Sequence, residues 1–318
     1  MSSGRGRRAL AVAGRLAVSV TLLWLVSRYV DVDEVLARLA GLSLGWVALG
    51  LAVSVLQVGV LAWRWRFTAA RLGIDLPLRE ALSEYYLGIL LNQVLPGGVT
   101  GDVSRAWRHA RTEAPTGPSV RAVILERVAA QVVMTLAAVV SVLMLPWASG
   151  AVRLTVAFVT TSVLMLVLAR VARVAMGARR MRSDSRMGRI WADVHQALLT
   201  REAFAAQLAS AILVVASYIV VFLVAARAVG METSIQAMLP LVAPVLMTML
   251  IPVTVAGWGI REAAAAALWG VAGLTPDDGA AVAVTYGLLV LVSSAPGLIV
   301  LMRDLIAGRG RRARPPRA

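Results

Sequence analysis

The chain has 318 residues, of which 59% are hydrophobic and 15% charged, and its mean hydropathy is +0.78. Soluble domains carry about 25% charged residues, so this composition excludes an ordinary soluble protein and indicates lipid as the surrounding solvent. The net charge is +15 and all 32 basic residues are arginine, but most lie in tails and short loops beside apolar segments, which is typical of membrane topology and not of nucleic-acid binding. With no cysteine and only His109 and His195, the sequence also excludes disulfides, a thiolate nucleophile and a histidine-rich metal centre.

The N-terminal part predicts a short basic tail followed by a membrane span. Residues 1–8 carry three arginines, and an apolar run over 9–27 follows. No small-x-small cleavage pattern follows that run, so we expect an uncleaved helix and not a signal peptide. A polar loop then leads to a second span over 44–63, which has tryptophans at both ends.

The segment 81–95 differs from these spans because it is only about 15 residues long. It contains Glu84 and Asn92 and ends at Pro96-Gly97-Gly98. An apolar segment so short, and broken at its end, predicts a re-entrant segment that enters the membrane and returns.

The remainder of the chain supplies more apolar segments and a basic tail. The candidate segments cover 122–145, 151–169, 204–226, 236–256, 259–274 and 280–302. The sequence leaves open whether 236–274 forms two full spans or one re-entrant hairpin. We therefore predict an all-α, polytopic helical bundle over 9–302 and a basic, disordered tail over 303–318.

The arginine distribution predicts the orientation of this bundle. Twenty-five arginines fall in the N-terminal tail and in 64–79, 105–121, 170–201 and 303–317, against four in the alternate loops. The positive-inside bias then places both termini in the cytoplasm, at the inner membrane, provided that the segment 81–96 does not cross.

Two broken stretches resemble each other. PGGVTGDVSRA begins at Pro96 and PVTVAGWGIREA begins at Pro252. In both, a glycine follows the proline by five positions (Gly101, Gly257) and an arginine follows it by nine (Arg105, Arg261). Inverted pairs of broken helices form midplane substrate sites in transporters, so the pair predicts an inverted repeat. Two unrelated helix breaks are the alternative.

Ionisable residues cluster after each break and near the start of the following segment. A charged side chain at the bilayer centre costs about 2.5–3.5 kcal/mol on insertion scales, so each is a candidate functional residue. The candidates are Asp102, Arg105, Glu126, Arg127, Arg261 and Glu262. Either each arginine neutralises a neighbouring acid, or Arg105 and Arg261 bind a lipid phosphate while the acids orient them.

These motifs resemble the transmembrane region of lysylphosphatidylglycerol synthases, also described as a flippase-like domain. The resemblance rests on Asn92-Gln-Val-Leu-Pro96 with Gly101-Asp102-x-x-Arg105, on Glu126-Arg127, and on Pro252 followed by Gly257-Trp-Gly259-Ile-Arg261-Glu262. It implies a polytopic domain that moves phospholipid between leaflets. Sixteen residues follow position 302, too few for the soluble aminoacyl-transfer domain, so we expect no aminoacylation by this chain alone.

We therefore predict a flippase-like, non-enzymatic protein that translocates a phospholipid or a lipid-linked substrate and needs no cofactor. One alternative is a membrane-embedded glycosyl or lipid transferase, with Asp31 and Asp33 as metal-binding carboxylates. The other is a non-transporting partner subunit of a separate synthase or glycosyltransferase.

Overall fold

A computed structural model describes residues 3–95, 100–112, 116–145, 186–249 and 254–312 of the protein. Within these ranges the regular elements are helices, as predicted. Four helical segments of the described residues are long and apolar enough to cross a membrane: Leu44–Arg71, Gly117–Leu143, Arg201–Ala228 and Pro276–Ile306. The protein is therefore a multi-pass membrane protein.

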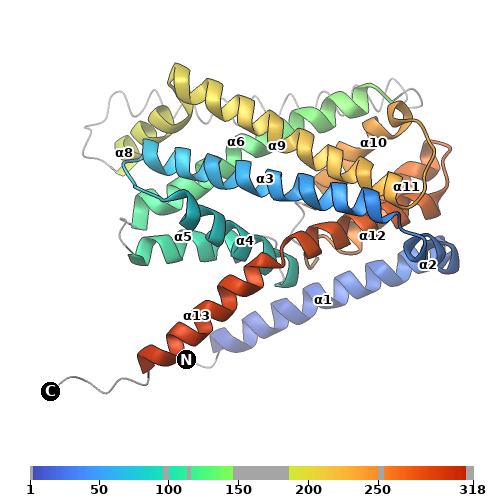
Figure 1. The fold of residues 1–318 in the computed structure, drawn as a ribbon, viewed down its shortest axis with the longest axis horizontal. Coiled ribbons are helices and arrows are strands. Elements are labelled where there is room, and N and C mark those ends of the chain that lie inside the picture. Colours follow the sequence, from blue (N-terminus) through green and yellow to red (C-terminus); the bar gives the residue numbers. More distant parts are fainter. Residues whose placement is uncertain (1–2, 96–99, 113–115, 146–185, 250–253, 313–318) are drawn as a thin grey trace.

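The helices follow one another in chain order as Figure 1 shows. They are α1 (Ser3–Tyr29), α2 (Val32–Ala40), α3 (Leu44–Arg71), α4 (Leu78–Val94), α5 (Thr100–Thr112), α6 (Thr116–Leu143), α8 (Arg186–Val194), the π-helical turn η1 (His195–Leu199), α9 (Arg201–Ala228), α10 (Ile235–Thr248), α11 (Ile260–Val271), α12 (Pro276–Ser293) and α13 (Pro296–Arg312). The predicted span 151–169 lies outside the described residues.

The long helices α3, α6 and α9 run side by side through the molecule, and short helices fill its two ends (Figure 1). One buried apolar cluster, around Trp65 and Tyr85, joins α3, α4 and α6. A second, around Phe222, Trp269 and Tyr286, joins α9, α11 and α12. The two halves of the bundle therefore have separate cores.

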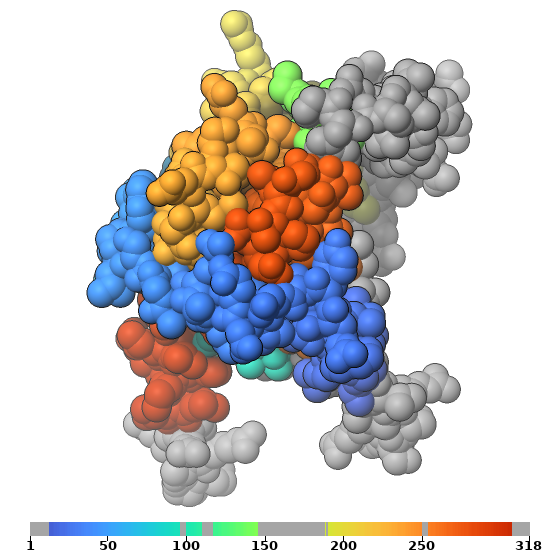
Figure 2. All heavy atoms as spheres, turned by 90° about the vertical axis from the view of Figure 1, so that its right-hand side faces the viewer, coloured from blue at the N-terminus to red at the C-terminus, as the bar shows by residue number. Residues whose placement is uncertain are grey.

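The segment between the first two predicted spans is a helix and not the polar loop expected from its acids. The side chain of Asp31 accepts hydrogen bonds from the backbone N–H groups of Asp33 and Glu34 and so caps the start of α2. Asp277 of α12 accepts a further bond from the Asp31 backbone N–H at 2.8 Å, and Arg38 pairs with Asp278 at 2.8 Å. These contacts dock α2 on the start of α12, at the end of the molecule that faces the viewer in Figure 2.

Four helices flanking the two predicted breaks are short. At 1.5 Å per residue, α10 is about 21 Å long and α11 about 18 Å, against about 30 Å for a hydrocarbon core. The helices α4 and α5, with 17 and 13 residues, pack against each other on the other side of the bundle. The breaks themselves fall at 96–99 and 250–253, so Pro96, Gly97, Gly98 and Pro252 lie outside the described residues.

Candidate functional site

A polar cavity of about 240 Å³ lies among α3, α4, α6, α9, α10 and α12. Glu126 and Arg127 of α6 supply its charged lining side chains, and Tyr85, Tyr218 and Tyr286 supply phenol groups. Its further polar lining residues are Gln57, Asn92, Gln93, Gln131 and Ser293. Polar groups thus converge in the middle of helices that are otherwise apolar.

Arg105 of α5 lies next to this cavity, behind Tyr85. Its guanidinium is stacked on two aromatic rings, at 3.9 Å from the Tyr85 ring centre and 4.6 Å from that of Trp65. The Arg105 side chain is only 1% exposed. Cation–π contacts are strongest when the cation is desolvated, so the rings help to hold a buried charge.

Two carboxylates neutralise Arg105. Its Nη2 pairs with Asp102 at 2.8 Å, one turn earlier on α5, and lies 3.5 Å from Oε2 of Glu126. The Tyr85 hydroxyl donates to that same Glu126 oxygen at 2.7 Å. Glu126 therefore links the arginine behind the tyrosine to the cavity in front of it.

Asp102 extends this network to Arg127. Its second oxygen lies 2.6 Å from Nη2 of Arg127, so one carboxylate is shared between two arginines. The Arg127 side chain is 49% exposed and lines the cavity, whereas Arg105 is buried. The four charges sum to zero, and Arg127 is the cation of this network that a ligand in the cavity can reach.

Close contacts join α4 and α5 on the two sides of the first break. Asn92, which lines the cavity near the end of α4, accepts a hydrogen bond from the Gly101 backbone N–H at 2.7 Å. A Cβ atom on Gly101 would lie 1.9 Å from the carbonyl oxygen of Gly88, so only glycine permits this approach of α5 to α4. These contacts position Asp102 and Arg105 on the first turns of α5.

Arg261 and Glu262 form the corresponding group after the second break. Arg261 is fully buried, and its Nη2 pairs with Glu262 at 2.5 Å. The other oxygen of Glu262 accepts the Gly259 backbone N–H at 2.7 Å, which caps the start of α11. Gly257 and Gly259 have φ angles of +81° and +89°, which favour glycine, so the turn that places this pair depends on both.

Arg261 also lies behind a cavity-lining tyrosine. Its guanidinium is 5.5 Å from the ring centre of Tyr286 and 4.8 Å from that of Trp258. Arg105 and Arg261 thus occupy comparable places, each behind a tyrosine that faces the same cavity, but neither lines the cavity itself. In each guanidinium, Nη1 is buried without a hydrogen-bond partner among the described residues.

Glu84 belongs to a different group. Both of its carboxylate oxygens accept hydrogen bonds from Arg108, at 2.8–3.0 Å, and Arg108 also pairs with Asp304 of α13 at 2.7 Å. These residues join α4, α5 and α13 away from the cavity lining. Glu84 therefore holds helices together and does not face the candidate site.

Arg64 is a buried charge, whereas the arginine distribution predicts a loop position for it in 64–79. It is fully buried in α3, where its Nη2 donates to the backbone carbonyl of Glu126 and to Gln207, each at 3.3 Å. No carboxylate of the described residues pairs with it, and its Nε and Nη1 have no hydrogen-bond partner there. The sequence does carry a sign that Arg64 belongs to a helix. Gln57, Arg64 and Thr68 are spaced so that they share one face of α3.

The family model described as the lysylphosphatidylglycerol synthase TM region matches residues 12–297. The match spans the described helices from α1 to the start of α13, with both arginine groups and the cavity between them. No curated protein matches the chain.

Proposed function

Because the chain belongs to the family of lysylphosphatidylglycerol synthase transmembrane regions, we propose that it moves a phospholipid or a lipid-linked substrate between the two leaflets. The observation that carries the proposal is the polar cavity with Glu126 and Arg127, which is bordered by α3, α6, α9 and α12, whose helical segments are apolar and long enough to cross a membrane. When a lipid moves between leaflets, its head group is the polar part that has to cross the apolar interior of the membrane. The proposed movement breaks no covalent bond.

The proposed role of the cavity is to replace head-group water. An unpaired polar or charged group in hydrocarbon is strongly unfavourable, and this cost is the barrier to spontaneous lipid crossing. The half-exposed Arg127 meets the phosphate first, in competition with Asp102. Arg105 and Arg261 follow as phosphate contacts when the rings of Tyr85 and Tyr286 move aside, since each has an Nη1 with no hydrogen-bond partner among the described residues.

We place the two broken regions, α4–α5 and α10–α11, as re-entrant hairpins of an inverted repeat. The short helices and the matching positions of Arg105 and Arg261 behind cavity tyrosines support this arrangement. Both regions then border one midplane site, as in transporters built from inverted repeats, the first through Asn92 and the second through Leu246, Met249 and Ala256. Movement of one repeat against the other opens the cavity to either leaflet.

The proposed orientation has both termini on the cytoplasmic side of the inner membrane. The arginine bias supports it, and the start of α1 lies at the same end of the molecule as the end of α13 (Figure 1). Single cysteines test it directly, because the native chain has none. Gly117→Cys, at the start of α6, is expected to react with an impermeant maleimide only from the inside, and Ala40→Cys only from the outside. Outside labelling of Gly117→Cys refutes the re-entrant α4–α5 hairpin.

The decisive test of function is reconstitution into liposomes with fluorescent lipids of several head groups. We expect the wild-type protein to move at least one of them, and the variant Arg127→Gln to move it more slowly. Protein that moves none of the lipids, yet co-purifies with a synthase or glycosyltransferase, supports the partner-subunit alternative. The transferase alternative keeps Asp31 and Asp33 as its candidate carboxylates, although Asp31 also caps the start of α2. A metal-dependent activity that Asp31→Ala abolishes would support that alternative.

A further inference from the structure

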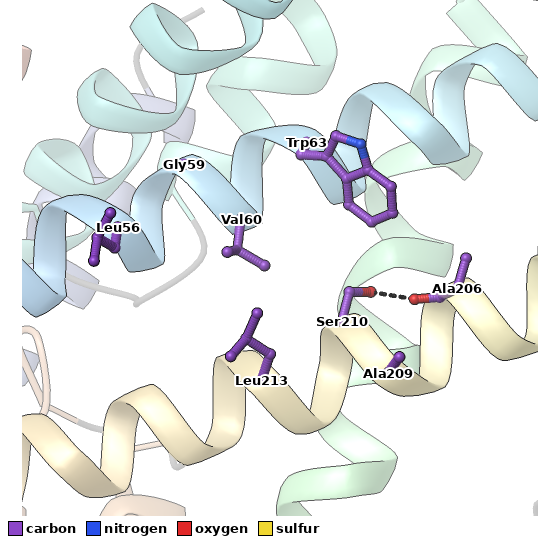
Figure 3. A pocket seen from close by; sticks show the side chains of 8 residues that line it. All are labelled: Leu56, Gly59, Val60, Trp63, Ala206, Ala209, Ser210 and Leu213. Atoms are coloured by element: carbon purple, nitrogen blue, oxygen red, sulfur yellow. Dashed lines mark hydrogen bonds between the residues drawn. The ribbon is translucent and has the colours of Figure 1, made fainter.

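A second hollow, the α3–α9 groove, lies on the outer side of the bundle. It has a volume of about 470 Å³. Its lining residues are Leu56, Gly59, Val60 and Trp63 of α3 and Ala206, Ala209, Ser210 and Leu213 of α9. Figure 3 shows Val60 and Leu213 pointing toward each other across it, with the Trp63 ring on the side of Ser210.

The lining of the groove suits hydrocarbon and not water. The hydroxyl group in this lining belongs to Ser210. It already donates a hydrogen bond to the Ala206 carbonyl of its own helix at 2.6 Å. Both α3 and α9 are long and apolar enough to span a membrane, so the medium outside the groove is the acyl-chain region of the bilayer. An apolar groove open to that region is filled by an acyl chain.

A cation follows the groove residues along α3. Arg66 follows Trp63 by three positions and therefore lies on the same face of α3, one turn nearer the helix end. Arg66 is exposed and takes part in none of the ion pairs of the described residues. A guanidinium at the end of a membrane helix is suited to bind a lipid phosphate in the adjacent leaflet.

The groove and the polar cavity are separated by the same two helices. Val58 and Leu61 of α3 and Val214 of α9 line the cavity from the inner side. Between the two helices, Gln57 donates a hydrogen bond to Ser217 at 2.8 Å. The cavity, at about 240 Å³, is smaller than the roughly 300–1,000 Å³ of pockets that enclose a drug-sized ligand, so it holds a head group but not the acyl chains.

We infer that the α3–α9 groove binds one acyl chain of an anionic phospholipid whose phosphate is held by Arg66. The inference rests on the proposed function. It adds the class of lipid that binds and the route of its head group into the cavity, which runs between α3 and α9. A lipid bound there lies against the α3–α9 contact, and separating the two helices lets its head group pass to Glu126 and Arg127.

The groove is tested by filling it. A Cβ atom on Gly59 meets no other atom within 4 Å, and the same holds for Gly45 on the same helix outside the groove. Gly59→Phe and Gly45→Phe are therefore matched variants that should both fold. Native mass spectrometry of protein in mixed phosphatidylglycerol and phosphatidylcholine micelles is expected to show bound phosphatidylglycerol on the wild type and Gly45→Phe, and its loss from Gly59→Phe.

The charge is tested with Arg66→Gln against Arg79→Gln, another exposed arginine outside the groove. We expect Arg66→Gln to lower the preference for phosphatidylglycerol over phosphatidylcholine about tenfold. Arg79→Gln should leave that preference unchanged. Equal lipid retention by Gly59→Phe and Gly45→Phe, or an unchanged preference in Arg66→Gln, overturns the inference. A wild-type dimer that Gly59→Phe separates without loss of lipid also overturns it, because the groove is then a protein interface.

The lipid-binding and transport measurements separate the two proposals. If Gly59→Phe loses phosphatidylglycerol but the wild type moves no lipid in liposomes, the groove assignment holds and the proposed function is wrong. If the wild type moves lipid and Gly59→Phe still retains phosphatidylglycerol and moves it at the wild-type rate, only the groove assignment is wrong.

Discussion

The two buried arginines, Arg105 and Arg261, have similar aromatic surroundings but differ in how their charge is balanced. Arg261 pairs at 2.5 Å with its sequence neighbour Glu262, which also caps α11. Arg105 shares its charge with Asp102 and with Glu126 of another helix, and Asp102 in turn pairs with the half-exposed Arg127. The group after the second break, Arg261 and Glu262, is closed, because its two charges pair only with each other among the described residues. The group after the first break, Arg105, Asp102, Glu126 and Arg127, is a chain of charges that reaches the cavity.

This difference predicts that the Arg261–Glu262 pair contributes more to stability, and that the network of Arg105, Asp102, Glu126 and Arg127 responds first to a ligand in the cavity. A closed pair inside one turn moves only as a unit with that turn. The ion pairs between α5 and α6 can exchange partners. If Arg127 leaves Asp102 to bind a ligand, Asp102 stays paired with Arg105. We therefore expect changes in the second group to act mainly on stability and changes in the first group to act increasingly on transport.

The largest effect on stability is expected for Arg261→Met. The change leaves Glu262, which is 1% exposed, as an unpaired buried carboxylate. Breaking a buried ion pair in this way costs about 3–5 kcal/mol. Thermal unfolding in detergent, followed by fluorescence-detected size exclusion, should show a large decrease in melting temperature or a loss of folded protein.

The double variant Arg261→Met/Glu262→Gln is the control for this reading. Glutamine removes the charge but keeps an oxygen that can accept the Gly259 N–H, so the cap of α11 is preserved. We expect it to recover most of the lost stability. If Arg261→Met alone is as stable as the wild type, the closed-pair interpretation of the second group is wrong.

A smaller loss of stability is expected for Arg105→Met. Asp102 keeps Arg127 as its cation. Glu126 loses a contact of 3.5 Å with Arg105, longer than the 2.5 Å pair of Arg261 and Glu262, and keeps the hydrogen bond from the Tyr85 hydroxyl. The cost should be about 1–3 kcal/mol, which is in the range for one lost charge-assisted hydrogen bond. The same melting assay measures it, and a loss equal to that of Arg261→Met would show that the two groups are equally closed.

Neutralisation by an acid close in sequence was one of two interpretations that the sequence left open. The structure pairs Asp102 with Arg105 and Arg261 with Glu262, but it pairs Glu126 with Arg105 and not with its neighbour Arg127. Asp102 and Arg105 are three positions apart on a helix and Arg261 and Glu262 are adjacent, so each pairing follows from local geometry. The tyrosines in front of the arginines come from other helices, α4 and α12, and tertiary packing alone brings them there. Arg64 was missed for another reason, because α3 continues to Arg71 beyond the apolar segment that ended at position 63.

The tyrosines offer a matched comparison with a modest expected effect. Tyr85 donates a hydrogen bond to Glu126 at 2.7 Å, whereas the Tyr286 hydroxyl makes no hydrogen bond among the described residues. Tyr85→Phe should therefore lower the free energy of unfolding by about 1–3 kcal/mol, and Tyr286→Phe should change it little. Chemical unfolding in mild detergent measures both, and equal losses would contradict the assignment of Glu126 to the Tyr85 side.

The smallest effect on stability, with a clear effect on transport, is expected for Arg127→Gln. The Arg127 side chain is 49% exposed, and Asp102 retains Arg105 when it is replaced. A pair so exposed contributes about 0–1 kcal/mol, so the variant should melt close to the wild type. If Arg127 meets the lipid phosphate, loss of a charge-assisted hydrogen bond in the crossing state should slow lipid movement about tenfold or more.

Arg127→Lys and Arg28→Gln complete this test. Lysine restores the charge without the planar fork that binds phosphate through two bonds, so Arg127→Lys should recover only part of the rate. Arg28, exposed near the end of α1, lies outside the cavity lining, and Arg28→Gln should move lipid normally. Liposome assays on all three variants decide the point. Folded Arg127→Gln protein that moves lipid at the wild-type rate would remove Arg127 from the path of the head group, and its ion pair with Asp102 would then serve only to neutralise charge.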